Sequence, residues 1–230
     1  MASISEPEPS EGPARPVAGV FDNGWPEPAA GSSGAFACST QRKVHHMPLT
    51  DDEKNLAAAI GFDQDVCEIV KEQTGCTLGR LTGFTEEHET EDVDGLSVTV
   101  ERQNVERLIA KLQPQLTPRG YRAFWSETCE SNGLKKSDEI AVLKTTNHHS
   151  IIEIRRSDGA NHGVSTDDVI RKLREWENCC QFEVFGAASA WVAIQFQTLP
   201  NDICAFAEEI YDFCPDTVEQ GVGLMNESDD

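Results

Sequence analysis

Apolar residues recur at helical spacing in the part of the chain that begins near residue 50. Thr50, followed three residues later by Glu53, has the pattern of a capping box. Asp63 marks the start of a second helical segment, and Gly75 is a residue type that ends helices. The apolar positions between them are Leu56 and Ile60, then Val66, Ile69 and Val70. Their spacing predicts two short helices before residue 75.

From Gly95 onwards, apolar residues alternate with polar ones in some segments, which predicts strands, and recur every three or four positions in others, which predicts helices. The expected strands cover residues 96–100, 121–125, 139–144, 182–185 and 191–196, with a hairpin turn at 186–190. The expected helices are 105–112, ended by Pro114 and Pro118; a short helix with Ile151, Ile152 and Ile154; one capped by Ser165 and Asp168; and one from residues 200–202 to 213. These elements predict an α+β fold, with helices packed on a mixed, largely antiparallel sheet whose strand order stays open.

Composition divides the chain into four regions. They are a disordered acidic leader rich in Pro, Gly and Ser (1–47), a helical segment with an acidic loop (48–94), the α+β domain (95–223) and a frayed tail (224–230). In the leader, Phe21, Trp25 and Phe36 dock on a partner, pack back on the domain, or have no role. The acidic run at 85–94 lacks the spacing of a calcium loop, and we interpret it as a solvated loop.

The net charge of the chain narrows its range of partners. It carries 19 Lys and Arg against 40 Asp and Glu, a formal charge of −21. Such a field repels phosphate backbones and anionic lipid, so we expect no nucleic-acid and no membrane partner. It suits a basic protein partner, although it equally suits simple solubility. The N-terminus has no secretory pattern and no segment is long and apolar enough to span a membrane, so we expect a cytoplasmic protein with reduced thiols.

Two polar segments contain the candidate binding residues. One is the hook that follows the last helix, where Pro215 ends the helix and Cys214 lies at its negative end, a position that disfavours a thiolate nucleophile. The other is a glycine-flanked turn just before a helix. Such residues commonly satisfy helix ends and turns, so a structural role stands beside a ligand-binding one. The candidate binding residues are Asp158, Asn161, His162, Cys214, Asp216 and Gln220.

The histidines and cysteines do not form a recognisable metal motif. His45-His46, His148-His149 and Cys179-Cys180 are adjacent pairs, and adjacent residues do not face one another on a helix. Shared ligation within a pair therefore needs further ligands from elsewhere in the chain. No motif for a hydrolase, metalloprotease or kinase is present. We predict no metal, no cofactor and no catalytic set, and whether the protein is an enzyme stays undecided.

Several segments resemble a bacterial family, the domain of unknown function 4253 family. They are Asp158–Ile170, the step Leu173-x-x-Trp176, the hook Tyr211–Gly221 and, more weakly, Gly120–Phe124. The resemblance extends over roughly 95–223 and implies the fold and a bacterial cytoplasmic setting. It implies no reaction, because the activity of the family is not established.

Three hypotheses of function remain. The first is a non-catalytic protein-interaction domain, of an immunity or regulatory type, because the chain is acidic and lacks a catalytic set. The alternative is a small-ligand-binding protein or enzyme with its site near the Asp158–His162 turn and the Cys214–Gln220 hook, which requires these segments to converge. The third is a purely structural accessory unit. The sequence leaves the oligomeric state open.

Overall fold

A six-stranded sheet organises the structure. Its strands are β1 (Gly79–Phe84), β2 (Thr90–Glu101), β3 (Arg122–Cys129), β4 (Ser137–Leu143), β5 (Gln181–Ala188) and β6 (Trp191–Thr198), in the spatial order β1-β2-β4-β3-β5-β6. Only β3 and β5 pair in parallel, and all other neighbours are antiparallel. The computed structural model describes residues 47–129 and 137–219, all within one compact unit. The predicted α+β fold with a largely antiparallel sheet is confirmed.

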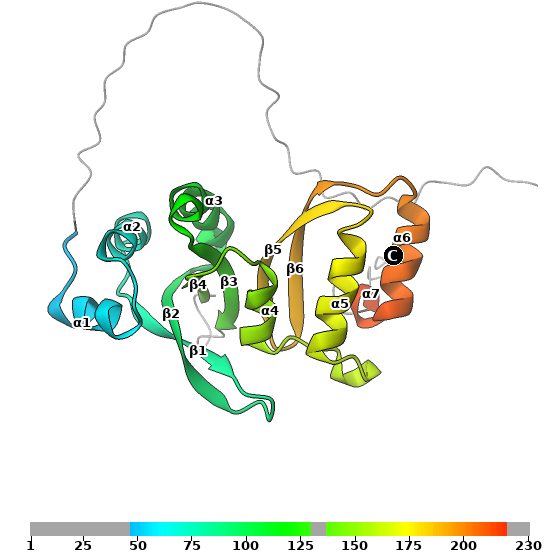
Figure 1. Cartoon of the computed structure of the whole chain (residues 1–230), viewed down its shortest axis with the longest axis horizontal. Helices are drawn as coiled ribbons and strands as arrows, with labels where there is room; N and C mark the ends of the chain where they lie inside the picture. Colours follow the sequence, from blue (N-terminus) through cyan, green and yellow to red (C-terminus); the bar gives the residue numbers. More distant parts are fainter. Residues whose placement is uncertain (1–46, 130–136, 220–230) are drawn as a thin grey trace, which may run out of the picture. The chain divides into compact units, whose positions relative to one another are not determined.

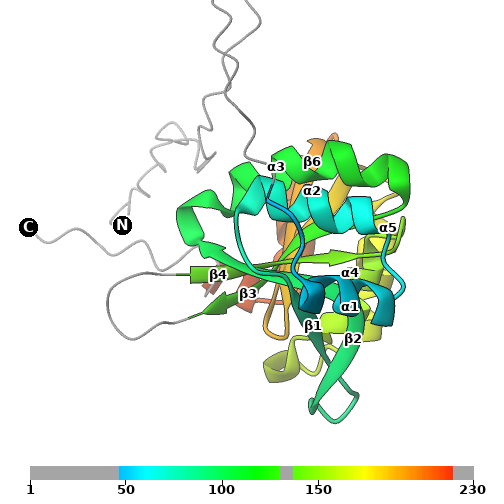
Figure 2. The same ribbon diagram turned by 90° about the vertical axis from the view of Figure 1, so that its left-hand side faces the viewer.

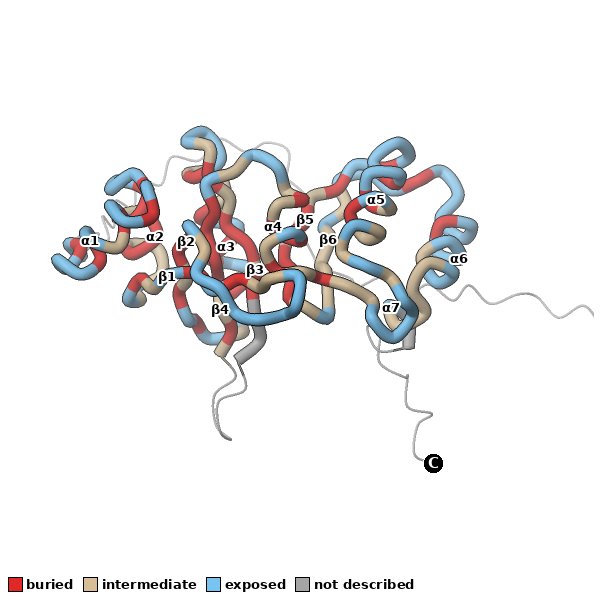
Figure 3. Tube along the Cα trace, turned by 60° about the horizontal axis from the view of Figure 1, so that its bottom comes forward, coloured by how far each residue is buried: buried red, intermediate tan, exposed pale blue. Residues whose placement is uncertain are grey.

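Helices cover both faces of this sheet (Figures 1 and 2). The helices are α1 (Asp51–Ala59), α2 (Gln64–Thr74), α3 (Val105–Leu116), α4 (His149–Arg155), α5 (Thr166–Trp176), α6 (Ile203–Phe213) and the single turn α7 (Asp216–Glu219). Along β4, Ile140 and Val142 pack into the core beneath α1–α3, whereas Ala141 and Leu143 pack into the core beneath α4–α6. This alternation follows from the two-residue period of a strand, and it makes the central strands buried on both sides, as Figure 3 shows.

Three of the helix ends that the sequence predicts are confirmed. Thr50 and Glu53 form a complete capping box at the start of α1, and Ser165 and Asp168 form another at the start of α5. Gly75 ends α2 with φ of 69°, a left-handed conformation that glycine adopts without strain. These signals are read correctly because each depends on residues within one turn of the helix end.

The acidic run at 85–94 is only partly the predicted loop. Residues Thr90–Asp94 form the first half of β2, and they pair with β1, an edge strand that the hydrophobic pattern did not indicate. Arg80 of β1 stabilises this pairing, with its Nη2 2.9 Å from Asp94 Oδ1. The run is exposed as expected, but strand β2 crosses the boundary that we placed between residues 94 and 95.

Helix α3 also extends further than predicted. Pro114 lies inside the helix, in its last turn, and α3 continues to Leu116 before a 3₁₀ turn and Gly120 end it. Leu112 and Leu116 are both fully buried, so core packing holds the chain helical across the proline. Side-chain donors also reach carbonyls of this turn: Gln115 Nε2 lies 2.9 Å from Lys111 O. A helix end near a proline is therefore decided by tertiary contacts as well as by the missing amide.

The connection after β4 positions the start of α4 against the sheet. The ring of His148, just before α4, lies parallel to the ring of Phe182 in β5, with 5.9 Å between centroids. Helix α5 packs beside α4 on the same face, so the end of α5, the start of α4 and strand β5 meet (Figure 1). Among the described residues, no helix has the length and apolar character that crossing a membrane requires.

Candidate functional site

The predicted turn and the predicted hook converge in the structure. Asn161 Nδ2 donates to Asp216 Oδ2 at 3.1 Å, and His162 Nε2 lies 3.1 Å from Asp216 Oδ1. Cys214 also reaches the turn, since a Cβ built on Gly159 would lie 3.3 Å from its Sγ. The contacts join segments that are more than 50 residues apart, through side chains that the sequence singled out.

Two of the predicted residues stand apart from this contact. Asp158 points to a different neighbour, with His88 Nε2 3.4 Å from its Oδ2, and it also accepts from Ala160 N at 3.3 Å. Gln220 lies outside the described residues. Asn161, His162 and Asp216 are engaged with one another, and they line neither of the two cavities described below. That these residues bind a ligand stays a prediction.

A second cluster forms around the histidine pair that the sequence analysis set aside. His148 is the N-cap of α4 and His149 its first residue, so the pair lies at the helix start and not within regular turns. The two rings are almost perpendicular, 87°, with 4.3 Å between centroids. Glu177, which caps the end of α5, supplies a third group: its Oε1 lies 2.7 Å from His148 Nε2 and 3.4 Å from His149 Nε2.

The opposite nitrogen of each ring lies near a side-chain oxygen atom. Asn147 Oδ1 accepts from the backbone amide of His149 at 3.1 Å, which identifies it as the amide oxygen. The same oxygen lies 3.2 Å from His149 Nδ1, so this nitrogen carries the proton of the neutral ring. His148 Nδ1 lies 3.3 Å from Glu183 Oε2 and accepts from Val184 N, also at 3.3 Å.

Burial favours the neutral form of His149. The residue is 5% exposed. Burial lowers its pKa below the ordinary value, and the neighbouring ring of His148 and the charge of Arg174 lower it further, against the opposing effect of Glu177. Within the described part of the chain, His149 Nε2 has no hydrogen-bond partner. A neutral ring protonated at Nδ1 leaves a free lone pair at this nitrogen.

These groups line an open cavity of about 410 Å³. Besides the two histidines, Asn147 and the two glutamates, Arg122 and Arg174 line it. Arg122 Nη1 binds Glu183 Oε2 at 2.6 Å, while Arg122 Nε is buried and has no partner among the described residues. The cavity thus brings together residues from the β4–α4 connection, α5, β3 and β5.

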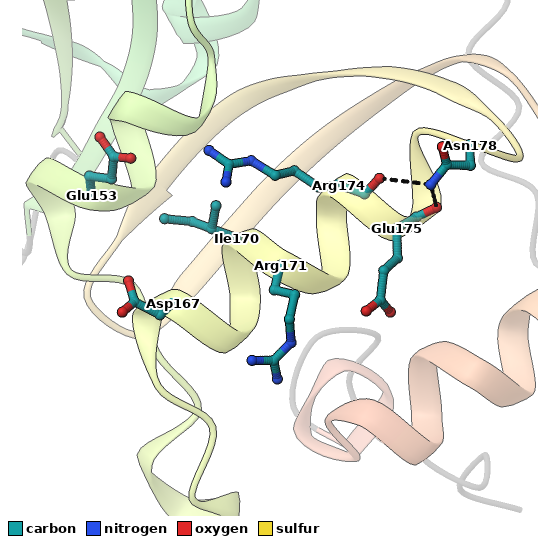
Figure 4. Close-up of a pocket in the computed structure, with 7 residues that line it drawn as sticks. All are labelled: Glu153, Asp167, Ile170, Arg171, Arg174, Glu175 and Asn178. Carbon is teal, nitrogen blue, oxygen red and sulfur yellow. Dashed lines mark hydrogen bonds between the residues drawn. The ribbon is translucent and has the colours of Figure 1, made fainter.

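A second cavity, of about 380 Å³, lies between α4 and α5 (Figure 4). Figure 4 shows Arg174 extending from α5 towards α4, which carries Glu153, while Arg171 and Glu175 extend away from it. Asn178 Nδ2 donates to the carbonyls of Arg174 and Glu175 at the end of α5. Arg174 lines both cavities, so its guanidinium group is available to either.

The sequence could not identify the histidine cluster as a site. His148 and His149 were visible as a pair, but their partner Glu177 lies 28 residues later, in a segment that reads as an ordinary helix end. The only local signal was Asn147, which precedes the histidines and whose side chain accepts from the His149 amide. Tertiary packing of α4 against α5 completes the cluster.

Comparison with protein families supports the predicted resemblance for the C-terminal region. Residues 139–229 match the family model described as "Domain of unknown function (DUF4253)". The match begins within β4 and includes the hook and the turn, whereas residues 95–138, which we had also assigned to the family, lie outside it. No curated protein and no solved structure matches the chain. The family description names no activity.

Proposed function

We propose that this protein binds a small anionic molecule, one that carries a carboxylate or phosphate group, in the cavity lined by Arg122, His148, His149 and Arg174. The observation that carries this proposal is the presence of two arginine side chains with unused donors in one cavity of a chain with net charge −21. Guanidinium groups match the planar oxygens of carboxylate and phosphate, and they offset the charges of Glu177 and Glu183 in the same cavity.

The two arginines have unused N–H donors for different reasons. Arg122 Nε is a buried N–H group without an acceptor in the described part of the chain, and such a group costs free energy unless a ligand satisfies it. Arg174 has no ion pair with any described residue, although its neighbours Arg171 and Lys172 both have one. The open cavity of about 410 Å³ has room for a small anion.

Isothermal titration calorimetry with inorganic phosphate and with malonate tests the proposal. We expect Arg174→Gln to weaken binding by about tenfold or more, because a hydrogen bond to a charged group is lost. Arg171→Gln is the matched control, since it removes the same charge from the same helix outside the cavity. Equal effects of the two variants, or no binding of either anion to the wild type, would refute the proposal.

A second candidate function is an interaction module of an immunity or regulatory type that binds a basic protein. What favours it is the apolar surface of α6, where Ile203 is 56% and Tyr211 43% exposed, with the exposed acidic residues Glu208 and Asp212 on the same helix. A basic partner would be attracted by the net charge and held by this surface. On the same charge argument we propose that it has no nucleic-acid or membrane partner, and we propose a cytoplasmic setting in which its cysteines stay reduced.

Affinity purification from native lysate at low salt tests the second candidate. We expect a stoichiometric basic protein with the wild type and its loss with Ile203→Glu, while Arg174→Gln retains it. Recovery of the same proteins by wild type and Ile203→Glu would count against α6 as the contact surface.

A further inference from the structure

We propose that His148, His149 and Glu177 bind a divalent transition-metal ion, of the class that prefers imidazole ligands and of which zinc is the representative. Nothing in the family description assigns a metal to this region. The proposal goes beyond anion binding and does not depend on it, because its ligands are the histidines and Glu177 and not the arginines. Two histidines and one carboxylate are a ligand set found in zinc sites that keep one position open.

The three ligand atoms already converge. One ligand atom from each of His148, His149 and Glu177 lies within 4.8 Å of the other two. Bonds of about 2.0–2.1 Å in a tetrahedral site place neighbouring ligand atoms about 3.3 Å apart. The distance of 3.4 Å from His149 Nε2 to Glu177 Oε1 matches that spacing, and the distance of 2.7 Å from His148 Nε2 must widen by about 0.6 Å. Glu177 is 37% exposed, so its side chain has room to make this shift.

The outer nitrogens of both rings have the partners that metal-bound histidines use. A ligating histidine typically donates its other ring N–H to a carboxylate or carbonyl oxygen, which fixes the tautomer. His149 Nδ1 lies 3.2 Å from Asn147 Oδ1, and His148 Nδ1 lies 3.3 Å from Glu183 Oε2. Glu183 is itself held by Arg122 at 2.6 Å. In both rings, therefore, Nε2 faces the cluster and Nδ1 faces a side-chain oxygen atom.

The contact between His149 and Glu177 also favours a cation between the two groups. With the ring proton on Nδ1, His149 Nε2 presents a lone pair to a carboxylate oxygen at 3.4 Å, and no hydrogen atom lies between the two acceptors. Two acceptors at this distance repel, whereas an ion between them binds both. Because His149 is 5% exposed, water reaches this nitrogen poorly and does not relieve the repulsion.

Metal binding requires one proton to change position. In the absence of an ion, the Nε2 proton of His148 is donated to Glu177 and its Nδ1 accepts from Val184 N. When the ion binds Nε2, the ring proton occupies Nδ1 and is donated to Glu183. The exchange gives up the bond from Val184 N, which at 3.3 Å is long.

The charged groups around the cluster balance one another. Arg122 and Arg174 oppose a cation, and Glu177 and Glu183 favour it. The remaining coordination position faces the cavity of about 410 Å³, where water or an anion held by Arg174 would complete the coordination. A metal ion would therefore also favour the anion proposed above.

Equilibrium dialysis of the full chain with Zn²⁺ alone, with the bound metal measured by mass spectrometry, tests the site. We expect one tightly bound equivalent in the wild type. Glu177→Gln preserves the size of this partly exposed side chain. Loss of a residue that only hydrogen-bonds to a metal ligand typically weakens metal binding by about 10- to 100-fold. Because Glu177 is a ligand itself, we expect Glu177→Gln to weaken zinc binding by more than that. We expect the same of His149→Gln, with circular dichroism to show that each variant is folded. Glu175→Gln and His162→Gln are matched controls that leave the cluster intact and should retain the equivalent.

Titration with Co²⁺ separates this site from the cysteines. An ion bound by nitrogen and oxygen ligands lacks the intense thiolate charge-transfer absorption, so we expect only weak visible bands in the wild type and their loss in Glu177→Gln. Thiolate bands only, no bound metal, or binding that Glu177→Gln leaves unchanged would overturn the metal site. Wild type that binds phosphate but no metal would overturn this inference and leave the anion proposal standing. Zinc binding together with a phosphate affinity that Arg174→Gln leaves unchanged would support the metal site and overturn the anion proposal.

Discussion

Glu53 is a buried carboxylate that links three segments of the first core. It is 2% exposed, and it forms an ion pair with Lys71 of α2, itself 6% exposed. It also accepts from Thr50 N at 2.8 Å and from Leu78 N at 3.1 Å. Burial acts to raise its pKa, but Lys71 and the two amides outweigh burial and lower the pKa to about 2.

We predict that the contribution of Glu53 to the free energy of unfolding is lost at acid pH. Its folded-state pKa is below the unfolded value of 4.5, so its contribution is complete above about pH 5 and is lost as the pH falls towards 2. Glu53→Gln leaves the buried Lys71 without a counter-charge, and we expect it to cost about 3–5 kcal/mol near pH 7. The difference in unfolding free energy between wild type and variant, measured by urea denaturation, should shrink between pH 5 and pH 2.

The double variant Glu53→Gln, Lys71→Met is the control for this prediction. It removes the unpaired charge as well, so it should recover much of the stability lost in the single variant at neutral pH. Wild-type and Glu53→Gln stabilities that fall in parallel between pH 5 and pH 2 would show that the pair does not act in this way.

At the scale of elements, the start of α5 depends on a reciprocal cap. Asp168 N donates to Ser165 Oγ at 3.2 Å, and Ser165 N donates to Asp168 Oδ2 at 3.0 Å. The Ser165 hydroxyl also donates to Asp168, and this bond, then the Ser165 amide and then Arg171, lower the pKa of Asp168 to about 2. The cap fixes where α5 begins, and with it the register that places Arg174 and Glu177 in the cavity.

We predict that Ser165→Ala destabilises the fold by about 1 kcal/mol, because the hydroxyl oxygen that accepts from the Asp168 amide is lost. We also predict that it raises the pKa of Asp168, because the hydroxyl group that donates to the Asp168 carboxylate is lost. Thermal unfolding measures the first effect, and an NMR titration of the Asp168 carboxyl measures the second. Thr166→Ala, at the next position of the same helix, should change neither by a comparable amount. An unchanged Asp168 pKa in Ser165→Ala would mean that the cap does not form.

Local signals were predictable from the sequence, and non-local ones were not. The capping boxes at Thr50 and Ser165 and the end of α2 at Gly75 depend on a few neighbouring residues, so the pattern was sufficient. Strand β1 escaped prediction because it is a short edge strand, held by pairing with an acidic segment that reads as a loop. The proline in α3 misled for the same reason, since buried residues on both sides of it decide where the helix ends.

The two candidate sites also differ in how far local sequence signals could identify them. Asn161, His162 and Asp216 stood out as polar residues in turns, and the structure brings them into contact with one another. The metal-type cluster needs Glu177, whose role depends on how α5 packs against α4. The rule against adjacent histidines assumes regular helix geometry, and it does not apply at the first residue of α4.

At the scale of the whole molecule, the two hydrophobic cores share one sheet. The first lies beneath α1–α3 and the second beneath α4–α6, and β3 and β4 contribute to both. Phe124 of β3 is fully buried in the second core, while Ala123 next to it belongs to the first. Losing either core would expose one face of the same central strands, so we expect the described unit to unfold as one.

The region that matches the family is therefore not a complete structural unit in this chain. The match begins at residue 139, within β4, and excludes β1, β2 and β3. Strand β3 lies between β4 and β5 in the sheet, so the match contains both neighbours of a strand that it lacks. The approach is close: a Cβ on Gly186 of β5 would lie 2.6 Å from Trp125 O of β3.

We predict that residues 139–229 produced alone do not fold cooperatively. Without β3, strands β4 and β5 have no partner between them, and Ile140 and Val142 lose the helices that bury them. Circular dichroism during heating should show no sharp transition for the fragment and a single one for the full chain. Mixing with residues 47–138 should restore a transition, because that piece supplies β3 and the first helical layer. A fragment that melts sharply without its complement would show that β4 and β5 can close the sheet directly, and that β3 is an insertion into a self-sufficient fold.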